Sequence, residues 1–358
     1  SFIARRADQK VEFIASTDNW FRPVNFVNGP DGAIYVLDMY RETIEHPYSV
    51  PEDIKKFLSL ESGDDRGRIY RLIPPKWKQP KPVKLAAASS RDLVKALDSD
   101  NGWTRQTAHR LLWERNDRRT VPLLAKTAVR SAQPLARAHS LWILHGLEAL
   151  EDKALVAALG DPSPRVREHA IVLAEDRLDR AVFRPALARL SGDPDPRVRY
   201  QVAFSLGTVG TAHRQLPLSQ LAKRAPADTH LRFAVMSSSL GLENKLLQAL
   251  LRDKVFLAKN GSSAWLSDFA RLAGANPKPT EAISILRLIL EQNHPSRRQA
   301  ELLTALGNGL SRRGQSVLGV LADQNTPAPL RNSADQVFRQ AVKTMAGSAS
   351  SAANRVAS

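Results

Sequence analysis

The chain has 358 residues, 43% of them hydrophobic and 25% charged, which is long enough for one elongated domain or two separate ones. The absence of cysteine excludes disulfides, thiolate metal sites, a catalytic cysteine and covalent haem attachment within these residues. Lys and Arg (52) outnumber Asp and Glu (36), a net charge of +16 that admits an anionic partner, but basic residues are not interleaved with aromatic ones as single-strand binders require.

The first part of the chain has the pattern of short β-strands. GPDG after residue 28 is predicted to form a tight turn, because Pro30 fixes φ and Gly32 accepts a positive φ. A short helix is expected over residues 52–58, begun by Pro51. Five strands are predicted in total, over residues 1–7, 11–16, 23–28, 33–40 and 67–73.

So few strands cannot form a stable domain alone. Strand–turn–strand units of this kind are typical of β-propellers, which have ~4–8 such blades. We therefore predict that residues 1–75 are the final blade, with part of the preceding one, of an incomplete propeller. The chain begins with Ser inside a predicted strand, so we expect it to be part of a longer protein.

Propeller geometry predicts which residues meet at the channel. If 23–28 is the innermost strand, the loop before it and the loop after 33–40 open on one rim. A His beside a carboxylate can accept a proton from an alcohol, and guanidinium groups can bind an anion. The candidate catalytic residues on this rim are Arg22, Asp38, Tyr40, Arg41, Glu45 and His46.

The alternative is a structural role for the same region. A buried aspartate often caps a backbone turn, aromatic residues pack between blades, and exposed arginines pair with nearby acids. The residues concerned are Asp38 as a cap, Trp20 and Phe21 as packing groups, and Arg66 and Arg68 as partners of Asp64 and Asp65.

After a basic linker over 76–88, residues 89–345 have the pattern of about eight helix pairs. DPSPRVREHAIVLAE (161–175) returns 32 residues later as DPDPRVRYQVAFSLG (193–207). Each pair has an apolar-periodic helix, an Asp/Pro/Ser turn and a second helix, so the pairs must stack to bury their apolar faces. One arginine recurs at about the repeat spacing, with one copy skipped before Arg298: Arg105, Arg137, Arg167, Arg199, Arg232, Arg298 and Arg331.

The D-P-x-P-R-V-R motif at 161–167 and 193–199 resembles the HEAT-repeat family. Residues of this kind usually bridge adjacent repeats, so a structural role is predicted for Asp161, Arg167, Asp193 and Arg199. His109, His139 and His169 also recur once per repeat. No acidic residues follow their register, so we predict structural histidines rather than metal ligands.

A longer resemblance spans the whole chain. WFRPVNFVNGPDGAIYVLDMYRETIEHP (20–47), SVPEDIKKFL (49–58) and DDRGRIYRL (64–72), followed by HEAT-like repeats, resemble the planctomycete-type membrane-bound dehydrogenases, whose propellers are similar to those of glucose/sorbosone dehydrogenases. The resemblance implies a mainly α fold, a HEAT-like α-solenoid preceded by the final blade or blades of a β-propeller. It also implies a periplasmic or membrane-associated protein that oxidises sugars or polyols.

The same resemblance implies cofactors. A quinone of the PQQ type would bind in the propeller, and haem c would belong to a C-x-x-C-H domain outside this chain, which has no cysteine. The Ala/Ser-rich tail over 346–358 would then be a flexible linker.

Three functions remain open at this point. The first is the C-terminal part of such a dehydrogenase, in which the solenoid separates the propeller from the haem domain or docks a partner. The second is a non-enzymatic scaffold that binds a partner protein on an extended surface. The third is a basic nucleic-acid binder, which the net charge permits and the β-rich front argues against. No P-loop, Rossmann, nucleophile-elbow or H-E-x-x-H motif is present.

Overall fold

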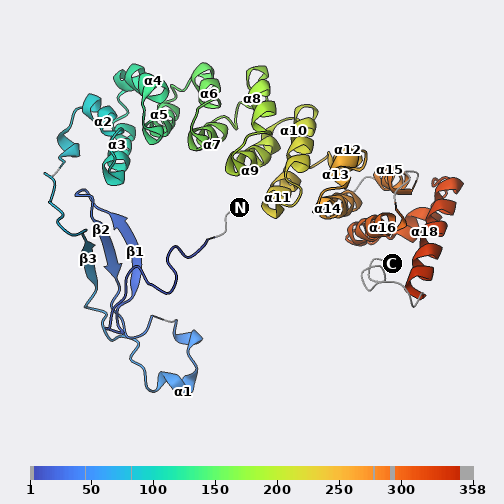
Figure 1. Ribbon diagram of the computed structural model, residues 1–358, viewed down its shortest axis with the longest axis horizontal. Helices are drawn as coiled ribbons and strands as arrows, with labels where there is room; N and C mark the ends of the chain where they lie inside the picture. Colours follow the sequence, from blue (N-terminus) through green and yellow to red (C-terminus); the bar gives the residue numbers. More distant parts are fainter. Residues whose placement is uncertain (1–3, 45, 82, 277–278, 291–294, 347–358) are drawn as a thin grey trace. The chain divides into compact units, whose positions relative to one another are not determined.

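The computed structural model describes residues 4–44, 46–81, 83–276, 279–290 and 295–346 (Figure 1). Its contacts divide the chain into two compact units, an N-terminal unit over Phe2–Ala158 and a C-terminal unit over Leu159–Ser358. The described residues are mainly helical, with one small antiparallel sheet before the helices. The predicted fold class is confirmed in this form: the β part is a three-stranded sheet and not a full propeller.

The sheet contains β1 (Pro23–Asn28), β2 (Ile34–Asp38) and β3 (Arg68–Leu72) in the order β1-β2-β3. Both pairs are antiparallel, and Val36 of the central strand lies opposite Phe26 and Tyr70. The GPDG turn joins β1 to β2, with Gly32 at φ +78° as predicted. These three strands are confirmed.

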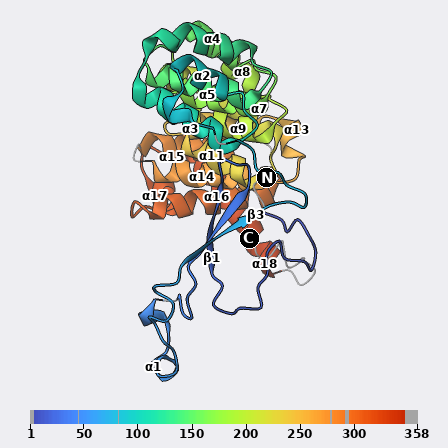
Figure 2. The same ribbon diagram turned by 90° about the vertical axis from the view of Figure 1, so that its left-hand side faces the viewer.

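The two outer strands predicted over 1–7 and 11–16 are wrong as far as the structure describes them, because residues 4–16 contain no strand. The apolar pattern has another cause: Ile14 and Ala15 line a cavity with Phe21 and Tyr70, so this segment covers a face of the sheet and does not extend its edge. The helix predicted over 52–58 is shorter than expected, since α1 spans Glu52–Lys55. Figures 1 and 2 show α1 at the tip of a long loop that leaves the sheet.

One side chain joins the sheet to the first helical repeat. Asn101 caps α3 (Gly102–Arg115), its Oδ1 accepting hydrogen bonds from the amides of Trp103 at 2.8 Å and Thr104 at 3.3 Å. Its Nδ2 donates to the carbonyl oxygens of Gly29 and Pro30 at 3.2 and 3.1 Å. The Gly-Pro-Asp-Gly turn is therefore anchored on the start of a helix.

The other helices of the N-terminal unit follow in short steps. The predicted linker is not structureless, because it includes the 3-10 helix η2. Leu93, Leu112 and Leu124 are almost completely buried, so the helices share one core. The elements are η1 (Pro47–Ser49), η2 (Leu85–Ala87), α2 (Ser90–Ala96), η3 (Arg118–Thr120), α4 (Val121–Arg130), α5 (Pro134–Gly146) and α6 (Asp152–Ala158).

In the C-terminal unit, α7 (Pro164–Leu173) and α9 (Pro196–Ser205) begin at the two prolines of the repeated motif, as the sequence predicts. These helices lie side by side, and α9 also packs on α11 (Thr229–Ser237). The remaining elements are η4 (Ala181–Phe183), α8 (Arg184–Leu190), η5 (Leu206–Thr208), α10 (Thr211–Arg224), α12 (Glu243–Leu251), α13 (Lys254–Leu257), α14 (Ser262–Ala275), α15 (Pro279–Leu290), α16 (Ser296–Ser311), α17 (Val317–Ala322) and α18 (Ala328–Ala346).

Helices α14 and α16 approach each other at two glycines. A Cβ on Gly309 would lie 2.1 Å from the carbonyl oxygen of Arg271, and one on Gly274 would lie 2.5 Å from that of Leu306. Only glycine allows this backbone contact. Across the described part of the chain, none of the helices combines the length and the hydropathy that a membrane crossing demands.

Candidate functional site

Asp38, at the end of β2, organises the predicted rim. Its side chain is buried, and its Oδ1 accepts hydrogen bonds from the amides of Arg22 at 2.7 Å and Tyr40 at 2.9 Å. Asp38 therefore caps the chain where it enters β1 and leaves β2. Its Oδ2 is also buried and has no hydrogen-bond partner among the described residues.

Tyr40 adopts a left-handed backbone, with φ +50°, which is uncommon for a bulky side chain. Its ring lies 5.7 Å from that of Trp20, and the Arg68 guanidinium lies 3.6 Å above it. Arg68 thus stacks on an aromatic ring, whereas Arg66 lies 3.4 Å from Asp65. Hydrogen bonds from the amide of Trp20 and from Tyr40 hold the pKa of Asp18 below its usual value.

The other rim candidates contact the backbone. The Arg22 guanidinium donates to the carbonyls of Asn19, Phe21 and Glu42, and that of Arg41 donates to Glu61 at 3.2 Å. His46 caps η1, with its Nδ1 accepting from the amide of Tyr48 at 3.3 Å. Glu45 lies outside the described residues. The structure brings Arg22, Asp38 and Tyr40 together and places Arg41 and His46 in the loop that follows.

The repeated arginines share one contact. In four repeats the guanidinium folds back on the turn before its own helix and donates to the carbonyl six residues earlier. These bonds join Arg105 to Ser99 (2.6 Å), Arg137 to Ser131 (2.8 Å), Arg167 to Asp161 (2.8 Å) and Arg199 to Asp193 (2.7 Å). The arginine therefore satisfies turn carbonyls that would otherwise lack a donor.

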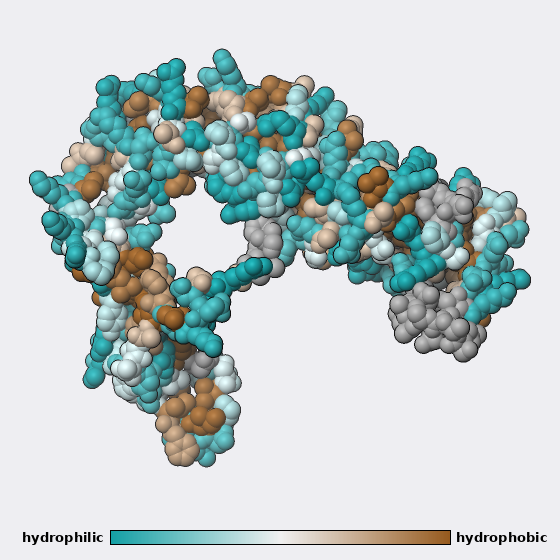
Figure 3. All heavy atoms as spheres, in the orientation of Figure 1, coloured by the Kyte–Doolittle hydropathy of each residue, from teal (hydrophilic) through white to brown (hydrophobic). Residues whose placement is uncertain are grey.

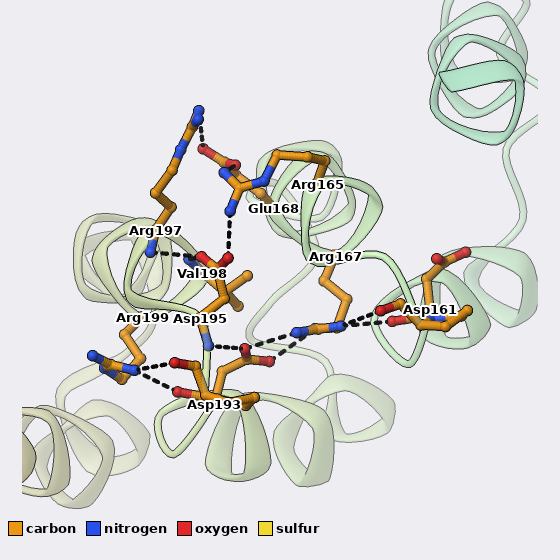
Figure 4. Close-up of polar contacts among 11 residues, drawn as sticks. Asp161, Arg165, Arg167, Glu168, Asp193, Asp195, Arg197, Val198 and Arg199 are labelled. Carbon is orange, nitrogen blue, oxygen red and sulfur yellow. Dashed lines mark hydrogen bonds and ion pairs between the residues drawn. The ribbon is translucent and has the colours of Figure 1, made fainter. Parts of the chain in front are cut away.

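Arg167 also reaches the next repeat (Figure 4). Its Nε and Nη2 donate to the two carboxylate oxygens of Asp193, both at 2.8 Å, and the two side chains are only 10% and 4% exposed. Asp193 also accepts from the amide of Asp195 at 2.9 Å. This buried, bidentate ion pair ties α7 to the turn that precedes α9.

A second group of charges lies nearer the surface of the same helices. Arg165 bonds Glu168 and lies 2.6 Å from Asp195, and Arg197 bonds Glu168 at 3.2 Å. Asp195 in turn caps α9 by accepting from the amides of residues 197 and 198. Polar side chains therefore brace α7 against α9 along the outer side of the ion pair.

Two of the repeat histidines meet in the N-terminal unit. His109 on α3 and His139 on α5 have their Nδ1 atoms 3.0 Å apart, so one ring donates, the other accepts, and at least one is neutral. Burial lowers the pKa of His109. His169 lies on α7, in the other unit. Within the described ranges, no three His, Cys, Asp or Glu side chains are grouped to bind a metal.

Lowering the pH from 7 to 5 is expected to destabilise the N-terminal unit through His109. Because folding depresses its pKa below 6.5, the unfolded chain takes up the proton first as the pH falls. The stabilisation present above pH 6.5 is lost as the pH falls through the folded-state pKa. Urea unfolding at pH 5, 6 and 7 gives the slope, which His109→Gln should flatten. An unchanged slope in that variant would contradict this role.

One face of α9 and α11 exposes aromatic rings. Tyr200 and Phe204 meet edge to face on α9, with ring centroids 4.8 Å apart, and Phe204 is 41% exposed. Phe233 on α11 is 56% exposed. Tyr200 and Phe233 hold equivalent positions, each one residue after a repeat arginine. Sequence reasoning missed these residues, although that shared position is a signal that could have identified them.

The sheet also exposes apolar residues. All of β1 is exposed, including Val24 at 57% and Phe26 at 52%, and Ile69 of β3 is 69% exposed. Figure 3 shows hydrophobic residues gathered over the sheet and over the loop that carries α1, where Phe57 is 87% exposed. Within the described part of the chain, the outer edges of β1 and β3 pair with no further strand. A sheet with these features has surface for further β-structure.

Amide exchange is expected to be faster in β1, β2 and β3 than in α7 and α9. The sheet has few buried side chains and two open edges, whereas α7 and α9 bury most of their apolar residues. Hydrogen–deuterium exchange followed by mass spectrometry compares the two regions directly. Equal protection would show that the sheet is stable as it stands.

Comparisons with known proteins identify two segments. Residues 1–76 match a domain of unknown function, DUF7133, and residues 151–237 match HEAT repeats. The second segment is a HEAT-repeat array. The chain is also similar to the X-ray structure of YibA from Escherichia coli, with 18% identity, a TM-score of 0.38, and coverage of 74% of this chain and 100% of that one. No curated protein matches.

These comparisons confirm the predicted HEAT repeats and a distinct N-terminal domain. Neither matching segment carries a dehydrogenase name, so that part of the predicted function remains a prediction.

Proposed function

We propose that this protein is a HEAT-repeat scaffold that binds a partner protein on the exposed face of α9 and α11. The observation that carries the proposal is the exposure of Phe204 and Phe233 on adjacent helices of a braced array. Exposed aromatic residues accompanied by arginine are typical of binding hot spots. Here Arg197, whose side chain is 50% exposed, stands on the same helix as Phe204.

The frame behind this face is well suited to recognition. The buried Arg167–Asp193 pair and the surface charges of Arg165, Glu168 and Asp195 fix α7 against α9. A rigid frame lowers the entropy lost when a partner binds. We therefore expect the partner to insert apolar side chains between the exposed rings, with little change in the helices.

The test compares two double variants. Phe204→Ser with Phe233→Ser removes the exposed rings, and Leu216→Ser with Val255→Ser removes two apolar residues that are 65% and 72% exposed elsewhere. Proteins captured from an extract of the source organism by the wild type are purified and titrated against all three forms. The proposal expects about a tenfold or greater loss of affinity for the first variant only. Equal affinities for all three forms would rule out this face.

A second candidate rests on the sheet. Its open edges and exposed apolar residues fit one blade of a larger β-structure, which supports a periplasmic or membrane-associated dehydrogenase that acts on sugars or polyols. The rim does not by itself form a quinone site: Arg22 and Arg41 donate to backbone carbonyls. No catalytic step is therefore assigned to these residues. Dye reduction by the full-length protein with a quinone of the PQQ type and a panel of sugars tests this candidate, and no reduction with any sugar would contradict it.

A further inference from the structure

The positive charge of the protein is concentrated in one region. Residues 76–130 contain 13 Lys and Arg against 5 Asp and Glu, a net charge of +8, which is half of the total of +16. The preceding residues 1–75 have a net charge of −2. The excess of cations therefore begins after the sheet and covers the first helical repeats.

Part of this region is a groove. A hollow of about 940 Å³ lies between α2, the end of α3, η3 and the start of α4. Pro122 and Leu123 supply apolar surface to its wall. Five cationic side chains line it: Arg91, Lys95, Arg115, Arg119 and Lys126.

The groove already holds one carboxylate of the chain itself. The Arg119 Nε and Nη2 donate to the two oxygens of Asp117 at 2.8 and 3.0 Å. These bonds lower the pKa of Asp117 to about 2. The pair shows that a carboxylate can be bound in this groove through a bidentate guanidinium contact.

The remaining cations differ in what they contact. Arg115 donates to the carbonyls of Ala86 and Ala88, and Lys95 lies 2.9 Å from Asp92. Arg91 and Lys126 are exposed, and neither lies within salt-bridge distance of an acidic side chain in the described part of the chain. Two cations thus face the groove without a carboxylate of this protein beside them.

We propose that this groove binds an acidic peptide segment of a partner protein. Carboxylates complement Arg91 and Lys126, and aliphatic side chains of the peptide can rest on Pro122 and Leu123. A nucleic acid fits less well, because the residues lining the groove include no aromatic ring on which a base could stack, and Asp117 would repel phosphates. The groove lies in the N-terminal unit, so the proposal is independent of the face of α9 and α11.

The test uses a fluorescein-labelled peptide of Glu, Ser and Leu, titrated by anisotropy into the whole protein at low and physiological salt. Arg91→Glu with Lys126→Glu is expected to weaken binding about tenfold or more. Arg130→Glu with Lys153→Glu changes the net charge equally, but at exposed positions that do not line the groove, and should leave the affinity unchanged. Circular dichroism confirms that both variants are folded.

Three outcomes would overturn the proposal. The peptide does not bind saturably, the two double variants lose affinity equally, or an oligothymidine of equal charge binds more tightly than the peptide and is lost with Arg91 and Lys126. The first excludes an acidic ligand, the second reduces the effect to net charge, and the third assigns the groove to nucleic acid.

Discussion

Replacing Asp193 by alanine is expected to lower the free energy of unfolding of the C-terminal unit by about 3–5 kcal/mol, because it leaves the Arg167 guanidinium buried without its counter-charge. The two side chains are joined by two 2.8 Å bonds and are almost inaccessible to water. The same carboxylate accepts the amide of Asp195 at the start of α9, so a backbone donor is lost as well. Urea unfolding monitored by circular dichroism measures the change.

Two comparisons separate the buried pair from charge in general. Glu114→Ala breaks the exposed Arg110–Glu114 pair on α3 and should cost no more than about 0.5 kcal/mol. Arg167→Met with Asp193→Leu removes both buried charges together and should be far less damaging than Asp193→Ala alone. If Asp193→Ala costs no more than Glu114→Ala, the ion pair does not stabilise the repeat array.

The repeat motif was open to prediction because its chemistry is local. Arg167 and Arg199 each donate to a carbonyl six residues earlier, so the spacing within the motif fixes the contact. The helix starts at Pro164 and Pro196 follow from proline's own geometry. The bidentate bond from Arg167 to Asp193 spans two repeats, and a period of 32 residues places these side chains close together.

The N-terminal region was predictable only in part, because its outcome depends on distant contacts. The apolar alternation at Ile14 and Ala15 is typical of a strand, but these residues cover a face of the sheet. Asp38 and Tyr40 were singled out as rim residues, and no sequence pattern signals the left-handed backbone at Tyr40 or the stacking of Arg68 on its ring. Likewise, the 30-residue spacing of His109 and His139 shows recurrence but not contact, which depends on side-chain directions.

Replacing Trp265 by alanine is expected to destabilise the C-terminal unit by about 3–5 kcal/mol, through the cavity it leaves. Trp265 on α14 is completely buried, and its ring lies 6.2 Å from that of Phe269. Its Nε1 donates to the carbonyl of Pro226 at 2.8 Å. Pro226 is six residues before Arg232, so the tryptophan of the following repeat bonds the carbonyl that the earlier repeats leave to their own arginine.

Trp265→Phe separates these two contributions, because it keeps most of the ring and removes the donor. Its cost should be about 1–3 kcal/mol, the penalty for a buried carbonyl left without a partner. The matched control is Trp113→Phe on α3, where the side chain is 49% exposed, and it should change stability by less than about 0.5 kcal/mol. Thermal unfolding of the four proteins ranks them. If Trp265→Phe is as stable as the wild type, the indole N–H does not replace the arginine, and only the volume of the side chain is required at this repeat.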